Sequence, residues 1–248
     1  MERRRDTGTG PWPRDSGEVP VSRSGWFYWV TKVVLTPIMT VYFRPRVEGR
    51  RNVPRRGAAL LACNHVSYLD WLALPLVVVR RRIVFLAKAE YFTRRGLRGR
   101  AQRFFFGATG QVPIDRTGGS AADAALRTSI RLLGEGALLG VFPEGTRSPD
   151  GRLYRGRTGI ARLAAQTGVP VVPCATVGLY ESARKGRVIA RPVTLTVRFG
   201  EPLLWPAGVE PTAEALRAWT DTLMERIQQL SGQEYVDADA REAKRRAA

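Results

Sequence analysis

A series of short apolar segments, each followed by a turn and then by residues with helical spacing, limits the choice of fold. The apolar segments span residues 58–63, 83–87, 110–114, 137–142, 169–175 and 193–199. Runs of this length between turn residues are typical of buried strands, and strands that alternate with helices are typical of a parallel sheet. The sequence therefore predicts an α/β fold, a single domain with a mainly parallel, twisted sheet flanked by helices.

Residues 211–230 are predicted to form a helix that packs on this sheet. Thr212 is a candidate N-cap residue at its start. Apolar side chains that recur every three or four residues lie on one face of a helix. In this segment they are Leu216, Trp219, Leu223 and Ile227.

Composition divides the chain into tails and a folded part. Residues 1–24 are rich in Arg, Gly, Pro and Asp, so we expect a disordered basic tail. A chain of 248 residues with 44% hydrophobic residues can bury one sizeable core. Residues 44–231 are therefore predicted to form one domain, and residues 232–248 a charged tail.

The segment 25–43 is almost wholly apolar but is interrupted by Lys32 and Pro37. A transmembrane helix needs about 20 apolar residues, so this segment is borderline in length and interrupted at its centre. Aromatic residues of the kind found at headgroup depth occur at Trp26, Tyr28, Trp29 and Tyr42. We predict a membrane-anchoring helical segment that is interfacial or re-entrant. A transmembrane helix and a core helix of a soluble protein are the alternatives.

The net charge of +18 indicates an anionic partner or surface. Charge alone does not choose between nucleic acid, anionic lipid and an acidic small molecule. The chain has no RNP-like aromatic pattern, no zinc-finger spacing and no clear recognition helix, so we expect no nucleic-acid partner. The arginine-rich residues 94–103 could lie against anionic headgroups, although a solvated face is the ordinary explanation.

The two cysteines, Cys63 and Cys174, lie in apolar strand-like runs without CxxC spacing. Because the chain also has a single histidine, neither a zinc site nor a disulfide framework is expected. A reducing cytoplasmic compartment fits this cysteine content.

The single histidine, His65, follows the apolar segment 58–63 and precedes Asp70 by five residues. On an unbroken helix these positions would be about 140° apart, so the side chains meet only if the chain turns between them. Ser67 and Asp70 have the spacing of a capping box, which would place Asp70 in the first helical turn. There its carboxylate could fix the imidazole tautomer and leave the other nitrogen to accept a proton. The simpler alternative is a helix cap beside a structural histidine.

Two further segments place arginines at strand ends. Residues 110–116 predict a strand that ends at Arg116, followed by a glycine-rich helix start, which suits an anion. Residues 142–148, Phe-Pro-Glu-Gly-Thr-Arg-Ser, combine a turn, a glycine, hydroxyls and Arg147. The two arginines could converge on one phosphate if their strands are neighbours. An ion pair with an arginine is the structural alternative for Glu144.

These segments, taken in order with residues 169–173, resemble the four blocks of the glycerolipid acyltransferase family, typified by 1-acylglycerol-3-phosphate acyltransferases. The resemblance covers roughly residues 45–200 and identifies residues 44–231 as the catalytic domain. It implies His65 as general base and Asp70 as its orienting partner. The residues it implies for the acceptor phosphate are Arg116, Glu144, Gly145, Thr146 and Arg147, and those for the acyl site are Val169, Pro170 and Pro173.

The resemblance also implies the reaction. An O-acyltransferase of this type moves a fatty acyl chain from acyl-CoA or acyl-carrier protein to lysophosphatidate and makes phosphatidate, without a metal or other cofactor. We expect it at the cytoplasmic face of the cell membrane, as a peripheral or monotopic protein on anionic lipids. Other acceptors, namely glycerol 3-phosphate, a lysophospholipid or another lipid alcohol, are alternatives, as are a catalytically silent lipid-binding protein and a mechanism in which Cys63 takes the acyl group first.

Overall fold

A computed structural model describes residues 25–88, 96, 111–114, 121–182 and 191–246. Within these ranges, seven strands form one sheet in the order β1-β8-β7-β2-β5-β3-β4. The strands are β1 (Arg46–Glu48), β2 (Ala59–Cys63), β3 (Ile83–Lys88), β4 (Gln111–Ile114), β5 (Leu138–Val141), β7 (Val171–Val177) and β8 (Thr196–Phe199). Every neighbouring pair is parallel except β7 and β8. The prediction of an α/β domain with a mainly parallel sheet is confirmed.

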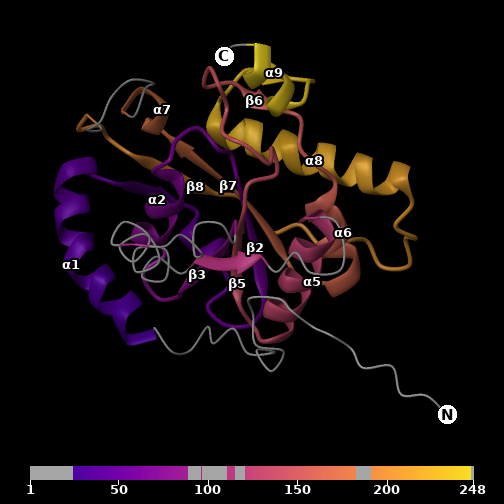
Figure 1. Cartoon of the computed structure of the whole chain (residues 1–248), viewed down its shortest axis with the longest axis horizontal. Coiled ribbons are helices and arrows are strands. Elements are labelled where there is room, and N and C mark those ends of the chain that lie inside the picture. The colour runs from indigo at the N-terminus through magenta and orange to yellow at the C-terminus, as the bar shows by residue number, and fades with distance from the viewer. Residues whose placement is uncertain (1–24, 89–95, 97–110, 115–120, 183–190, 247–248) are drawn as a thin grey trace.

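Helices cover both faces of this sheet (Figure 1). Helices α1 (Gly25–Phe43) and α2 (Asp70–Val77) lie on one face, and α5 (Ala121–Gly134), α6 (Gly159–Thr167) and α8 (Ala213–Ser231) lie on the other. The remaining described elements are the 3₁₀ helix η1 (Arg50–Asn52), α7 (Leu179–Ser182), α9 (Ala240–Arg246), and a two-stranded sheet of β6 (Leu153–Tyr154) and β9 (Tyr235–Val236).

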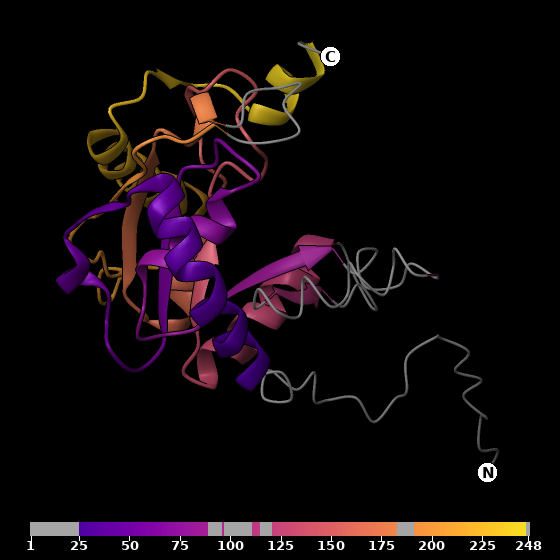
Figure 2. The same ribbon diagram turned by 90° about the vertical axis from the view of Figure 1, so that its left-hand side faces the viewer.

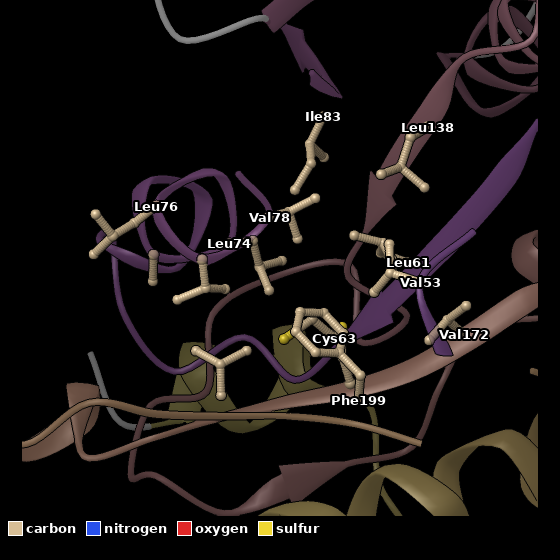
Figure 3. Close-up of a cluster of buried hydrophobic side chains, with 14 of the residues drawn as sticks. Val53, Leu61, Cys63, Leu74, Leu76, Val78, Ile83, Leu138, Val172 and Phe199 are labelled. Carbon is tan, nitrogen blue, oxygen red and sulfur yellow. The ribbon is translucent and has the colours of Figure 1, made fainter. Parts of the chain in front are cut away.

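The core consists of two clusters, one on each face of the sheet. Strand β2 contributes to both, because successive side chains of a strand point to opposite faces. Leu61 and Cys63 face α2 and pack with residues such as Leu74 (Figure 3), whereas Leu60 and Ala62 face the cluster that includes α8. All five residues of β2 are fully buried, as expected for a parallel sheet with both faces covered.

Helix α8 agrees with its sequence prediction. The Thr212 hydroxyl accepts a hydrogen bond of 3.2 Å from the Ala215 backbone N–H and caps the helix. The predicted apolar stripe is buried against the sheet at Leu216, Trp219, Leu223 and Ile227.

Three features differ from the sequence prediction. Strand β1 was not predicted, because its three residues lie in a basic stretch broken by prolines, and it is held by parallel pairing with β8. Strand β8 covers 196–199 rather than 193–199 and runs antiparallel to β7. Residues 232–248, predicted as a charged tail, carry β9 and α9, and Asp239 there pairs with Arg157 at 2.6 Å.

Helix α1 begins and ends where the apolar segment 25–43 predicted a helix. Tyr28 and Phe43 face the core and are nearly fully buried, whereas the outward side chains include Val33 at 71% exposure and Val41 at 79%. Figure 2 shows this helix on the outside of the molecule. None of the helices within the described ranges has the length and apolar character needed to cross a bilayer. Residues 1–24, and 94–103 apart from Gly96, lie outside those ranges.

Candidate active site

His65 lies in the loop between β2 and α2, at the carboxyl end of a central strand. Its Nδ1 is 2.8 Å from Oδ2 of Asp70, the first residue of α2. The chain therefore turns between the two residues as predicted. Because Asp70 holds Nδ1, Nε2 is the ring nitrogen that can take a proton from a substrate.

The Asp70 carboxylate is completely buried and fully hydrogen-bonded. Its Oδ2 also accepts the backbone N–H groups of Val66 and Ser67, each at 2.8 Å, and its Oδ1 accepts the Thr176 hydroxyl at 3.0 Å. The predicted capping box is only half formed, because Leu69 occupies the N-cap position and the Ser67 hydroxyl accepts from the Leu69 N–H. These donors hold the carboxylate in place independently of its hydrogen bond to the imidazole.

The segment Phe142–Ser148 wraps around the backbone of His65. Glu144 Oε1 accepts the His65 N–H at 2.8 Å, and the Ser148 N–H donates to the His65 carbonyl at 2.7 Å. Both backbone polar groups of His65 are thus satisfied by one distant turn. This contact explains why the two motifs, nearly 80 positions apart in the chain, form one site.

An aromatic ring stacks on one face of the His65 imidazole. The Phe142 ring lies 4.0 Å from the His65 ring, centroid to centroid, with an angle of 14° between the planes. The Phe85 ring of β3 is also stacked with Phe142, with 5.7 Å between the ring centroids. Packing and the Asp70 hydrogen bond together leave the His65 side chain 16% exposed. The ring is therefore oriented but still reachable.

Glu144, which the sequence predicts to bind the acceptor phosphate, has its carboxylate hydrogen-bonded to the protein backbone. Its side chain is 1% exposed and its carboxylate accepts two backbone N–H groups, from His65 and from Tyr154 at 3.0 Å. Burial raises its pKa to about 7, although both hydrogen bonds act in the opposite direction. These hydrogen bonds connect Glu144 directly to the backbone of His65 and of Tyr154. Among the described residues, no arginine forms an ion pair with Glu144.

The turn that contains Glu144 has features suited to an anion. Gly145 adopts φ 71°, a left-handed conformation that favours glycine, and the N–H groups of Thr146 and Arg147 have no acceptor within the described ranges. The Arg147 side chain is exposed and pairs with no carboxylate there. Successive free N–H groups after such a turn form an anion-binding concavity. Arg116 lies outside the described residues.

The predicted acyl-site residues are not grouped around His65. In the parallel register Cys63 pairs with Cys174, so Val169 and Pro170 precede β7 at the opposite end of the sheet. Pro173 lies inside β7 beside Ala62, and its carbonyl accepts the Gly200 N–H just beyond the end of β8. Proline has no backbone N–H to donate. Because β8 has already ended opposite Pro173, the sheet tolerates a proline at this position.

Three polar residues that support the site were not predicted. Asn64 binds the β7 backbone through Oδ1, which accepts the Thr176 N–H at 2.8 Å, and through Nδ2, which donates to the Thr176 carbonyl at 3.1 Å. Nδ2 also donates to Gln233 Oε1 at 2.7 Å. Only the position of Asn64 beside His65 gave a signal in the sequence. Thr176 and Gln233 are more than 100 residues away and become partners only through the sheet topology.

Cys63 is unsuited to the covalent alternative. Its side chain is fully buried, and burial raises the pKa of its thiol. Both cysteines are free thiols. No group of three or more His, Cys, Asp or Glu side chains in the described part of the chain is arranged to hold a metal ion.

Comparison with known proteins agrees with this geometry. The family model described as Acyltransferase matches residues 44–177. A curated 1-acyl-sn-glycerol-3-phosphate acyltransferase of Bacillus subtilis is 29% identical over 75% of this chain and 87% of its own length. One from Limnanthes alba is 40% identical over 63% of this chain and 53% of its own length.

A solved structure has the same fold. The crystal structure of the 1-acyl-sn-glycerophosphate acyltransferase PlsC from Thermotoga maritima aligns with a TM-score of 0.58 and 25% identity. The alignment covers 86% of this chain and 91% of that one. The chain therefore belongs to the acyltransferase family, as an O-acyltransferase of the 1-acylglycerol-3-phosphate acyltransferase type.

Proposed function

We propose that this enzyme transfers a fatty acyl group from acyl-CoA or acyl-carrier protein to the free hydroxyl of lysophosphatidate, giving phosphatidate. The observation that carries the proposal is the His65–Asp70 pair at 2.8 Å, with the His65 backbone held by the turn that presents Arg147. General base and anion-binding turn thus belong to one rigid unit. The relatives from Bacillus and Limnanthes are named for the same acceptor.

The chemical step uses His65 twice. Nε2 takes the proton of the acceptor hydroxyl as its oxygen attacks the thioester carbonyl, and the imidazolium is stabilised by Asp70. The tetrahedral intermediate then collapses, the carbon–sulfur bond breaks, and the imidazolium returns the proton to the leaving thiolate. The thioester already supplies an activated carbonyl, so the proposed reaction needs no cofactor.

One backbone group in the His65 loop is a candidate donor for the developing oxyanion. The N–H groups of Val66 and Ser67 are bound by Asp70, and that of Leu69 is bound by Ser67. The Tyr68 N–H has no acceptor within the described ranges. A preorganised donor of this kind is worth most where charge develops in the transition state.

The acceptor would be anchored through its phosphate by Arg147 and the free N–H groups of the 145–147 turn. Arg116, which the resemblance implies as a second arginine, remains part of this proposal. Guanidinium groups bind phosphate by paired, charge-assisted hydrogen bonds. A phosphate fixed there would hold the acceptor next to His65.

We further propose that the enzyme works as a peripheral or monotopic protein at the cytoplasmic face of the cell membrane. The exposed apolar residues of α1, among them Val33 and Val41, would lie in the interface, and anionic lipids would attract the net charge of +18. Buried free thiols fit a reducing compartment.

The test is thiol release from acyl-CoA with a panel of acceptors: lysophosphatidate, glycerol 3-phosphate, a lysophospholipid with a larger headgroup, and a lipid alcohol without phosphate. Lysophosphatidate should give the highest kcat/KM, and Arg147→Ala should raise KM for phosphate-bearing acceptors while leaving the phosphate-free alcohol unchanged. Arg162→Ala, an exposed arginine on α6, is the matched control. Equal selectivity in wild type and Arg147→Ala would refute the phosphate site, and a preference for another acceptor would replace lysophosphatidate.

A further inference from the structure

A pocket of about 320 Å³ lies between the η1 region and the segment that follows α2. Its lining is unusual, because five arginines surround an apolar wall. The lining residues are Arg50, Arg51, Val53, Pro54, Arg55, Val78, Val79, Arg80 and Arg81. We refer to it as the arginine pocket.

The arginine pocket is positively charged, and none of its lining residues is acidic. Arg81 anchors it, since its guanidinium donates to the carbonyls of Pro54, Gly57 and Gly136 at 2.7 to 3.0 Å, and no carboxylate of the described residues pairs with it. Within the described ranges, the other four arginines form no ion pair. Several guanidinium groups around one cavity favour an anion with multiple oxygens.

The wall of the pocket is apolar and is part of the core. Val53 and Val78 are buried in the cluster shown in Figure 3, whereas Val79 beside them is 50% exposed. A purely ionic ligand would gain nothing from this wall. The combination suits an amphiphile whose phosphate meets the arginines and whose apolar part covers Val79.

This pocket is separate from the candidate active site. Its residues precede β2 and β3, at the amino ends of these parallel strands, whereas His65 follows the carboxyl end of β2. Five residues of a parallel strand span roughly 16 Å. The acceptor phosphate bound beside His65 therefore cannot also occupy the arginine pocket.

Helix α1 lies next to the pocket. Lys32 Nζ donates to the carbonyl of Val78, a lining residue, at 2.6 Å, and Arg82 stacks over the Tyr28 ring at 5.3 Å. The outer face of the same helix carries exposed Trp29 and Val33. A membrane surface that receives α1 would bring its headgroups to this side of the molecule.

We propose that the arginine pocket binds the phosphate headgroup of an anionic membrane phospholipid and fixes the orientation of the enzyme on the bilayer. This inference rests on the proposed membrane association of the enzyme. The occupant is a structural lipid of the bilayer rather than the acceptor or the product.

The test measures binding of the full-length enzyme to phosphatidylcholine vesicles with and without phosphatidylglycerol. Neither lipid is the acceptor or the product of the proposed reaction. Arg50→Gln/Arg80→Gln should bind phosphatidylglycerol vesicles about 10- to 30-fold more weakly than wild type. Arg162→Gln/Arg226→Gln removes the same charge from exposed sites on α6 and α8 and should bind within about twofold of wild type. Equal losses in both double variants would overturn the pocket, because the effect would then follow net charge alone.

A second pair of variants separates a built pocket from a diffuse positive surface. Arg50→Lys/Arg80→Lys keeps the charge but loses the planar guanidinium groups that bind phosphate in pairs. It should still bind at least about fivefold more weakly than wild type. Wild-type affinity in this lysine variant would contradict the proposal.

Soluble ligands distinguish the sources of phosphate. CoA, added without vesicles, should raise the melting temperature of wild type and of Arg50→Gln/Arg80→Gln equally, because its expected site is at the other end of the sheet. A CoA-induced increase that is lost in the variant would assign the pocket to the nucleotide of the donor instead. Thiol release with a monomeric acceptor should be the same in both proteins, so failure of the proposed reaction and failure of the lipid site give different results.

Discussion

At the scale of single residues, Glu144 links stability to pH. Its pKa rises from the ordinary 4.5 to about 7 in the fold because burial disfavours the charge. Between these values the folded state binds more protons than the unfolded state, so the free energy of unfolding falls as pH rises. Below pH 4.5 the carboxyl is neutral in both states and the effect is absent.

We therefore expect the free energy of unfolding to be about 2 to 3 kcal/mol lower at pH 8 than at pH 5 from this residue alone. Glu144→Gln should lose that pH-dependent contribution, whatever its absolute stability. Urea denaturation at both pH values checks this, with Glu210→Gln on the exposed surface as control. The same pH slope in wild type and Glu144→Gln would show that Glu144 does not titrate in this range.

Thr176 is a positioning residue for Asp70. Thr176→Val keeps the shape of the side chain but removes the hydroxyl that donates to Oδ1 at 3.0 Å. We expect a loss of about 1 to 3 kcal/mol in stability and a lower kcat with little change in KM, since the Asp70 charge is less firmly held. Thr176→Ser should restore kcat because it restores the donor. A kcat unaffected by either change would remove Thr176 from the site.

The sequence was sufficient to predict His65 and Asp70 as a pair, because their spacing and the single histidine are local signals. It was not sufficient for Thr176, whose contact with Asp70 depends on the register of β7 against β2. For Glu144 the sequence predicted the turn but not the hydrogen bonds of its carboxylate to the backbone of His65 and Tyr154. Whether a carboxylate faces solvent or a buried backbone is decided by packing.

At the scale of elements, α1 combines a buried face and an exposed apolar face. Tyr28, Lys32 and Phe43 fix it to the domain, and the outer side chains Val33 and Val41 have no covering element in the described structure. Val33→Asp/Val41→Asp should weaken binding to vesicles by at least about tenfold, because charges disfavour the interface. Turnover of a monomeric acceptor should stay unchanged. Unchanged vesicle binding, measured by flotation, would contradict the interfacial role of α1.

The central elements were predictable and the edge elements were not. Strands β2, β5 and β7 are strongly apolar, so their character is local. The two-residue strands β6 and β9 and the three-residue β1 have no such pattern. They are strands because a neighbour pairs with them, and their formation depends on tertiary structure.

At the scale of the whole molecule, the sheet separates two tasks. Its central carboxyl edge carries His65 and the Phe142–Ser148 turn, and its amino edge carries the arginine pocket beside α1. The α/β class followed from the alternation of apolar and helical segments. The antiparallel β8 and the packing of residues 232–246 did not, because they depend on contacts between segments far apart in the chain.

The most direct test is the rate of thiol release from acyl-CoA in the presence of lysophosphatidate, compared between wild type and His65→Ala. If His65 is the general base held by Asp70, kcat should fall by at least about 100-fold, while the protein keeps its melting temperature and its affinity for vesicles. Turnover by His65→Ala at the wild-type rate would contradict the central claim.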